Sequence, residues 1–195
     1  VLHRHFYRSA IIGLDRPFVV YTPPGYDPAG RTKYPVLYLL HGFSDAEDAW
    51  TSVGRANVIL DNLIAQDKAR PMLVVMPLGY GNSEVIAGGW AGLRNMAVWR
   101  DSNEKFRDAL LAEVIPQVEK VYRVSTDRND RAIAGLSMGG TQSLLAGLNA
   151  LDRFAWIGAF SSGGLDADFD RRYPAVDGSL NTRLHLFWIS CGRED

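Results

Sequence analysis

Short apolar runs recur along the 195-residue chain and are separated by polar or glycine-rich segments. Two of these runs, at 6–12 and 17–21, flank a Gly-Leu-Asp turn and are typical of an antiparallel strand pair. The runs at 35–40 and 72–76 show no polar alternation, as expected for strands that are buried on both faces. Further runs at 131–134, 155–160 and 184–190 bring the predicted number of strands to about seven.

Helical periodicity alternates with these strands. Residues 52–68 repeat apolar positions with a helical period, and a small-residue helix is predicted at 140–150. Another helix is expected to begin near Asp101, with Asp101 and Glu104 as an N-terminal capping pair, and Pro116 should kink or break it. Strands that alternate with helices predict an α/β fold, with a mostly parallel central sheet and helices on both faces.

The segment 78–100 is glycine-rich and without periodicity, so it is predicted to be a long functional loop near the site. Trp50, Trp90 and Trp99 fall in or beside strand-end loops, where they could form a wall for an aromatic acyl group or a sugar ring. Core packing is the stronger interpretation for Trp50. For Trp90 a pocket role and a packing role stay open.

Composition narrows the function classes. With 21 basic and 22 acidic residues and a net charge of -1, the chain shows no basic block that would indicate nucleic-acid binding. No apolar run is long enough for a membrane span, and Cys191, the single cysteine, excludes an intrachain disulfide. No His, Asp and Glu cluster has ligand spacing, so no metal is expected. Residues 1–195 are expected to form one domain.

The most informative motif is the pentapeptide Gly135-Leu136-Ser137-Met138-Gly139, which reads Gly-x-Ser-x-Gly. A predicted strand precedes it and a predicted helix follows it, which is the setting of a nucleophile elbow. In such an elbow a strained turn exposes the serine hydroxyl above the sheet, so Ser137 is the candidate nucleophile. The alternative is a fortuitous glycine turn.

Two other strand ends carry candidate chemistry. His41-Gly42-Phe43-Ser44 follows the run at 35–40, and the backbone N–H groups of Phe43 and Met138 could form an oxyanion hole. Such a donor typically contributes about 3–4 kcal/mol to the stability of the transition state. After the last predicted strand, Asp195 could orient a histidine, with Glu194 as the competing carboxylate. An ordinary glycine turn and a solvated acidic turn are the respective alternatives.

These segments together resemble a known family. HGFSDAEDAW, GLSMGG, WISCGRED and the upstream YTPPGYD are similar to the α/β-hydrolase esterases of carbohydrate esterase family 1, which includes feruloyl and acetylxylan esterases. The broader group also contains enterochelin-type esterases and mycolyltransferases. The resemblance implies an α/β-hydrolase fold, Ser137 as nucleophile, Asp195 as acid, and Phe43 and Met138 as oxyanion donors. It further implies that no cofactor is needed and suggests a secreted or periplasmic location.

The family's histidine follows the acid, so we expect this chain to be C-terminally incomplete, without the histidine, the last strand and the last helix. A bare sheet edge and an exposed apolar face should result, and copies of the chain could associate through them. Of the four histidines, His41 lies near the site, but the family uses that position to brace the oxyanion loop. His185, His3 and His5 are expected to lie away from Ser137.

The sequence therefore predicts a serine esterase that acts on carbohydrate-linked or phenolic-acid esters through an acyl-enzyme. Trp90, Trp99 and Ser44 are candidate substrate-binding residues. Two alternatives stay open at this point. One is acyl transfer to a sugar hydroxyl, and the other is a hydrolase shell that binds carbohydrate without catalysis.

Overall fold

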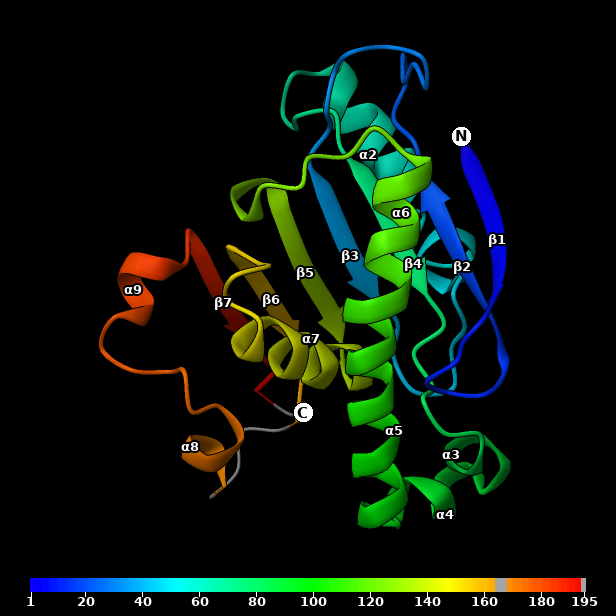
Figure 1. Cartoon of the computed structure of the whole chain (residues 1–195), viewed down its shortest axis with the longest axis vertical. Helices are drawn as coiled ribbons and strands as arrows, with labels where there is room; N and C mark the ends of the chain where they lie inside the picture. The colour runs from blue at the N-terminus through cyan, green and yellow to red at the C-terminus, as the bar shows by residue number, and fades with distance from the viewer. Residues whose placement is uncertain (164–167, 194–195) are drawn as a thin grey trace.

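A seven-stranded sheet forms the centre of the computed structural model, which describes residues 1–163 and 168–193 (Figure 1). The strands are β1 (Leu2–Arg8), β2 (Asp15–Tyr21), β3 (Val36–Leu40), β4 (Leu73–Pro77), β5 (Arg131–Leu136), β6 (Trp156–Phe160) and β7 (Leu186–Ser190). Their order in the sheet is β1-β2-β4-β3-β5-β6-β7. β1 and β2 are antiparallel to each other, and β2 is antiparallel to β4. The remaining pairs are parallel, so the predicted mostly parallel α/β sheet is confirmed.

Helices connect the strands and cover both faces of the sheet. They are α1 (Ala49–Ser52), α2 (Ala56–Ala65), α3 (Glu84–Ala87), α4 (Gly89–Arg94), α5 (Met96–Ala109), α6 (Ile115–Val121), α7 (Met138–Asn149), α8 (Phe169–Arg172) and α9 (Leu180–Arg183). A π-helical turn, Leu110–Val114, joins α5 to α6 in one long column, which lies in front of the sheet with α7 (Figure 1).

Successive side chains along each strand point to opposite faces of the sheet, so the hydrophobic core has two parts. On one face Tyr38 and Leu40 of β3 pack with Ile133 of β5 against the helices α5, α6 and α7. On the other face Leu39 belongs to a smaller cluster with Trp50 of α1 and Leu60 of α2. Trp50 is therefore a packing residue, and its indole Nε1 donates to Leu40 O at 3.0 Å.

The second face is open over β5, β6 and β7. Trp156, Phe160 and Leu186 are exposed there, and Trp188 is 53% exposed. Together with Ala132 and Gly158 they line an apolar groove of about 580 Å³. Among the described residues the predicted exposed apolar face is thus present.

The first strand begins earlier than predicted. β1 is Leu2–Arg8 rather than 6–12, because the chain turns at Ser9. Glu113 holds this turn: it accepts from Ser9 Oγ at 2.6 Å and from the N–H groups of Ala10 and Ile11 at 2.8 and 3.1 Å. A carboxylate from a distant helix is not visible in the local apolar pattern, which explains the error.

The prediction of a structureless loop at 78–100 is wrong, because the segment contains α3, α4 and the first turn of α5. Asn95 Oδ1 caps α5 by accepting from Val98 N at 3.4 Å, so the helix begins before Asp101. Asp101 is therefore not a cap, and instead its carboxylate binds Lys105 at 2.9 Å and Asn82 at 2.8 Å.

Two other helix predictions are only partly right. The helix expected at 52–68 is divided, with α1 ending at Ser52 and α2 beginning at Ala56. Pro116 lies in the first turn of α6, directly after the π-helical turn, so the predicted interruption of the long helix is confirmed. Proline has no N–H to donate to the preceding turn, and it lies where the hydrogen-bond pattern of the column changes from π-helical to α-helical.

Candidate active site

Ser137 occupies a sharp turn between β5 and α7. Its backbone has φ 54° and ψ -112°, a conformation that costs a non-glycine residue energy and is common at functional sites. The Ser137 N–H donates to Phe160 O of the neighbouring strand at 2.8 Å, which holds the turn in place. The serine is exposed, so this turn has the geometry expected of a nucleophile elbow.

The glycines on either side of the elbow are required by close packing. A Cβ on Gly135 would lie 2.4 Å from the carbonyl carbon of Gly139. A Cβ on Gly139 would lie 2.4 Å from Leu40 O. Both contacts are with backbone that cannot move aside, so only glycine fits at these two positions.

The loop after β3 lies beside the serine. A Cβ on Gly42 would be 3.8 Å from Ser137 Cβ, and Phe43, Ser137 and Met138 line the same cavity. The structure thus brings together Ser137, the candidate nucleophile, and the two predicted oxyanion donors. Ser44, with φ 71°, is exposed and is not among the residues that line the cavity as described.

His41 is buried beneath this loop and both its nitrogens are engaged. Nδ1 lies 2.8 Å from Gly42 O, and Nε2 accepts from the Gly79 N–H at 2.8 Å. The imidazole therefore donates from Nδ1 and is neutral, since Nε2 must be free of a proton to accept. Burial lowers the pKa of His41, which favours the same state. His41 braces the loop and has no nitrogen to offer Ser137.

The other three histidines lie elsewhere. His185 precedes β7, where its ring lies 5.1 Å from that of Trp156, and about 16 Å of strand separates that end of the sheet from the Ser137 end. His3 and His5 lie on β1, four strand positions and about 19 Å from β5. Within the described residues, no histidine hydrogen-bonds Ser137 Oγ.

The end of β7 reaches the same edge of the sheet as the serine. Leu136 of β5 pairs with Phe160 of β6, which in turn pairs with Ser190 of β7. The Ser161 N–H donates to Ser190 O at 2.7 Å, just past these ends. Asp195 and Glu194 lie outside the described residues, so the role of Asp195 stays a prediction.

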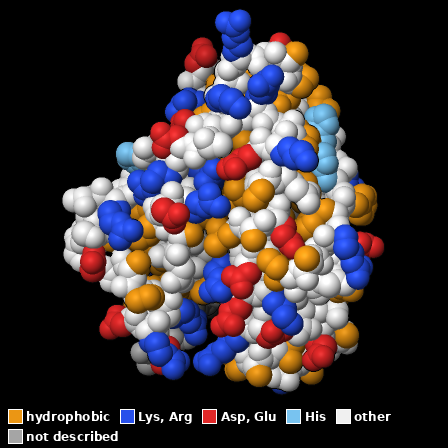
Figure 2. Space-filling model, viewed as in Figure 1, with side chains coloured by type: hydrophobic (Ala, Val, Ile, Leu, Met, Phe, Trp, Pro, Cys, Tyr) orange, Lys and Arg blue, Asp and Glu red, His pale blue; other side chains and the backbone are white. Residues whose placement is uncertain are grey.

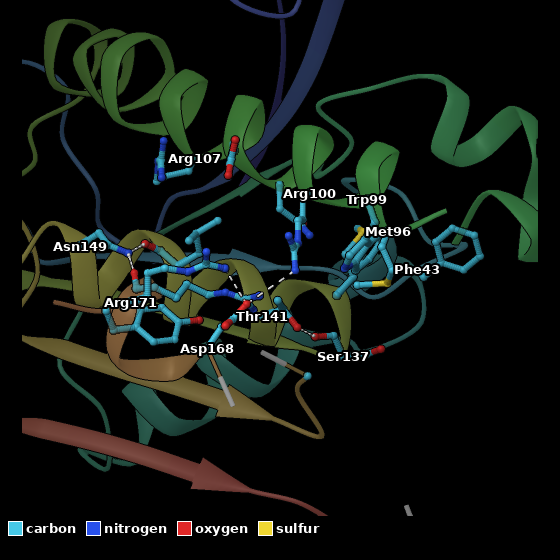
Figure 3. Close-up of a pocket in the computed structure, with 17 residues that line it drawn as sticks. Phe43, Met96, Trp99, Arg100, Arg107, Ser137, Thr141, Asn149, Asp168 and Arg171 are labelled. Carbon is cyan, nitrogen blue, oxygen red and sulfur yellow. Dashed lines mark hydrogen bonds and ion pairs between the residues drawn. The ribbon is translucent and has the colours of Figure 1, made fainter. Parts of the chain in front are cut away.

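A cavity of about 700 Å³ extends from Ser137 along the space between α5 and α7. At its serine end lie Phe43, Met96 and Trp99, which give an apolar and aromatic wall (Figure 3). Trp99 is half-buried and lines this cavity, and its role in substrate binding stays a prediction. Trp90 lies in α4, and its side chain is outside the described part of the structure.

Several cavity residues were not predicted from the sequence. Arg100, Asn103 and Arg107 come from α5, and Asp168 and Arg171 come from the segment of α8. The α5 residues repeat at helical spacing together with Met96 and Trp99. That spacing groups them on one face of a helix, which the incorrect helix start at Asp101 concealed, but it does not show that this face borders a cavity.

Neither a metal site nor a membrane helix is found in residues 1–163 and 168–193. This part of the chain holds no group of three or more His, Cys, Asp or Glu side chains that could bind a metal ion. None of its helices combines the length and the apolar character that crossing a membrane requires.

The mostly parallel sheet with a serine elbow at its C-terminal edge is that of the α/β-hydrolase esterases. The family described as "Putative esterase" matches residues 9–182, and the chain belongs to this family.

Individual relatives agree with this assignment. The chain is 37% identical over 147 residues to an endo-1,4-beta-xylanase/feruloyl esterase of Xylanibacter ruminicola, a match that covers 74% of this chain and 19% of that protein. It therefore spans only a small part of that relative. A solved ferulic acid esterase shares 33% identity, with a TM-score of 0.69 over 83% of this chain and 60% of that one.

A likeness of fold alone extends to a CE1 ferulic acid esterase of Anaeromyces mucronatus in complex with ferulic acid. The two chains share 22% identity with a TM-score of 0.76, over 98% of this chain and 83% of that one.

Proposed function

We propose that this chain is the catalytic part of a serine esterase that cleaves carbohydrate-linked or phenolic-acid esters. The observation that carries the proposal is Ser137, held in a strained turn at the mouth of a cavity beside Phe43 and Met138. Strain of this kind persists only where the surrounding structure imposes it, and Gly135 and Gly139 show that it is imposed here.

In the proposed reaction Ser137 Oγ attacks the carbonyl carbon of the ester. The hydroxyl proton passes to a general base, which the family resemblance implies is a histidine oriented by Asp195; none of His3, His5, His41 and His185 is placed to be this base. The carbonyl oxygen becomes an oxyanion bound by the N–H groups of Phe43 and Met138. Collapse of this intermediate releases the alcohol, which takes the proton, and leaves an acyl-enzyme. Water then repeats the steps and releases the acid.

The apolar end of the cavity supports an aromatic acyl group as substrate. Trp99, Met96 and Phe43 offer the flat and polarizable surfaces on which a phenolic ring packs well. Two of the relatives carry the names feruloyl esterase and ferulic acid esterase, which points to the same class of acyl group.

The proposal is tested by combining covalent labelling with turnover. A fluorophosphonate probe should label the wild-type chain on Ser137, and methyl ferulate should be hydrolysed. Ser137→Ala should lose both signals, whereas Ser52→Ala, which removes an exposed helical hydroxyl, should retain both. Labelling or hydrolysis that survives in Ser137→Ala would overturn the assignment.

A second candidate function is ester binding without efficient turnover. It is favoured by one observation: His41 is bonded through both nitrogens, and the other three histidines lie away from the serine. Without a general base, a serine hydroxyl is a weak nucleophile. Added imidazole separates the two candidates, because it can replace a missing base.

Under this second candidate, the Ser137-dependent rate of p-nitrophenyl acetate hydrolysis should be low and should rise with imidazole concentration. Imidazole also hydrolyses this ester directly, so the rate with Ser137→Ala is subtracted at each concentration. A high rate that imidazole does not change would exclude the second candidate.

A further inference from the structure

The cavity beside Ser137 is a channel built from one face of each of two helices. From α7 it takes Met138, Thr141, Leu145 and Asn149, and from α5 it takes Met96, Trp99, Arg100, Asn103, Glu104 and Arg107. These residues recur three or four positions apart, so they follow the helix axes. Twelve residues from Ser137 to Asn149 correspond to a length of about 18 Å.

The two helices are tied together along this channel. Gln142 of α7 donates through Nε2 to Asn103 Oδ1 of α5 at 3.1 Å, and also to Gly79 O at 2.7 Å. The channel therefore has two fixed walls and can accept an extended ligand without rearranging them.

The chemistry of the channel changes along its length. Phe43, Met96 and Trp99 lie at the end nearest Ser137, whereas Arg100 and Arg107 follow further along α5 (Figure 3). Arg171 of α8 faces them from the other side. Figure 2 shows basic side chains gathered on this face of the molecule, in the region between α8 and α5.

Among the described residues that line the channel, arginines outnumber carboxylates. Arg100, Arg107, Arg171 and Arg172 line the channel, with Glu104 and Asp168 as the lining carboxylates. Asp168 is shared, since it lies 2.6 Å from Arg171 and 3.9 Å from Arg100. Arg107 binds Asp108 at 2.8 Å. Two guanidinium groups that share one carboxylate retain donors for a second anion.

Stability does not account for this arrangement. The side chains of Arg100 and Arg171 are 53% and 76% exposed, and ion pairs that are this exposed to solvent contribute little to stability. Guanidinium groups instead match the geometry of carboxylates and bind them through two parallel hydrogen bonds.

We propose that the channel recognises a carboxylate on the ester substrate, with Arg100 and Arg171 as its principal binding groups. The inference rests on the proposed function, since it places the reacting carbonyl at Ser137. Arg100 and Arg107 of α5 line the channel together with Thr141 and Asn149 of α7, which lie four and twelve residues along that helix from Ser137 (Figure 3). The carboxylate should therefore be about 6–18 Å from the reacting carbonyl.

Two kinds of ester carry a carboxylate at this distance. In one it belongs to the alcohol side, as in an acidic glycan that contains a uronic acid. In the other it belongs to the acyl side, as in the half-ester of a long dicarboxylic acid. Both would place the same anion beside the same arginines, and the test below distinguishes them.

The experiment measures affinity in Ser137→Ala, which keeps the ester intact. Titration calorimetry compares a feruloyl ester of a glucuronic acid disaccharide with its neutral methyl uronate. A second pair compares the monomethyl and dimethyl esters of a long dicarboxylic acid. We expect the carboxylate to bind roughly tenfold more tightly than its neutral partner in one pair, as a charge-assisted bond gives. The pair that shows the preference identifies the side that carries the anion.

Adding Arg100→Gln should reduce the preference to about twofold or less, because the neutral amide cannot replace the guanidinium. Arg31→Gln, which changes an exposed arginine that does not line the channel, should keep the preference. High salt should also reduce the preference for the carboxylate over the neutral ester. Equal affinities for acid and ester in both pairs, or equal effects of the two arginine variants, would overturn the inference.

Failure of the proposed function would look different. If the wild-type chain neither hydrolyses methyl ferulate nor reacts with the fluorophosphonate, the esterase proposal fails whatever the calorimetry gives. If the wild-type chain hydrolyses methyl ferulate but shows no charge preference, only the carboxylate inference fails.

Discussion

Gly139 packs directly on the carbonyl of Leu40, so closely that a Cβ at position 139 would lie 2.4 Å from Leu40 O. The first turn of α7 is thereby fixed against the end of β3, from which the loop with Phe43 leaves. The position of Ser137 relative to the predicted oxyanion donors therefore depends on a backbone contact, and no side chain has to adjust for it.

Gly139→Ala should destabilise the fold by about 3 kcal/mol, because the new methyl group overlaps backbone atoms that cannot yield. Denaturant unfolding measures this change. Gly178→Ala is the matched control: it has no atom within 4 Å of its Cβ position and should stay within about 0.5 kcal/mol of wild type. Equal midpoints for the two variants would show that α7 can shift away from β3.

His41 should make the stability pH-dependent. Burial lowers its pKa in the folded chain below the ordinary value of 6.5, so the unfolded chain takes up the proton first. Stability should then be complete above pH 6.5 and should fall as the pH drops below it, by up to about 1.4 kcal/mol per pH unit. Unfolding midpoints at several pH values measure this slope.

His41→Gln should show a shallower fall over the same range, whereas Thr126→Gln, which changes an exposed residue that does not titrate, should keep the wild-type slope. The pKa of His5 is also lowered by burial, and it contributes the same sign to all three proteins. Identical slopes for wild type and His41→Gln would mean that His41 binds its proton equally well in the folded and unfolded chains.

Trp99→Ala should change acyl-group selectivity. Trp99 lines the serine end of the cavity, so its loss should reduce kcat/KM for methyl ferulate about tenfold more than for an acetyl ester. Trp188→Ala removes an exposed indole on the other face and should leave the ratio of the two rates unchanged. A parallel loss with both esters would assign Trp99 to packing alone.

The open face over β5, β6 and β7 should cause copies of the chain to associate. Its groove of about 580 Å³ is lined by apolar side chains, including Trp156 and Trp188, which water solvates poorly. Sedimentation velocity should show a mean mass that rises with protein concentration, and Trp188→Lys should shift this rise to higher concentration. Val53→Lys, at an 81% exposed apolar residue away from the groove, is the control.

The strands of the sheet were the most predictable part of the fold. β3 and β4 were located to within one residue, because strands buried on both faces leave uninterrupted apolar runs. The elbow was equally visible, since the close contacts at Gly135 and Gly139 require glycine and so appear in the sequence itself.

The basic half of the channel was not predictable from local pattern. Arg100 and Arg107 lie on α5, and the sequence of this helix does not distinguish their face from an ordinary solvent-exposed one. They line a cavity only because α5 packs beside α7. Arg171 reaches the same place from a segment far along the chain. Such sites arise from tertiary contacts between elements, so the spacing of residues in one element does not reveal them.

The π-helical turn at Leu110–Val114 changes the direction in which side chains face along the long helix formed by α5 and α6. It contains one more residue than an α-helical turn, so the part before it and the part after it are offset by about 100°. The part before it directs Trp99 and Arg100 toward the cavity, while Ile115 and Val118 after it anchor the column in the core. Deleting one residue from this turn would remove the offset and rotate the whole cavity wall by about 100° away from Ser137.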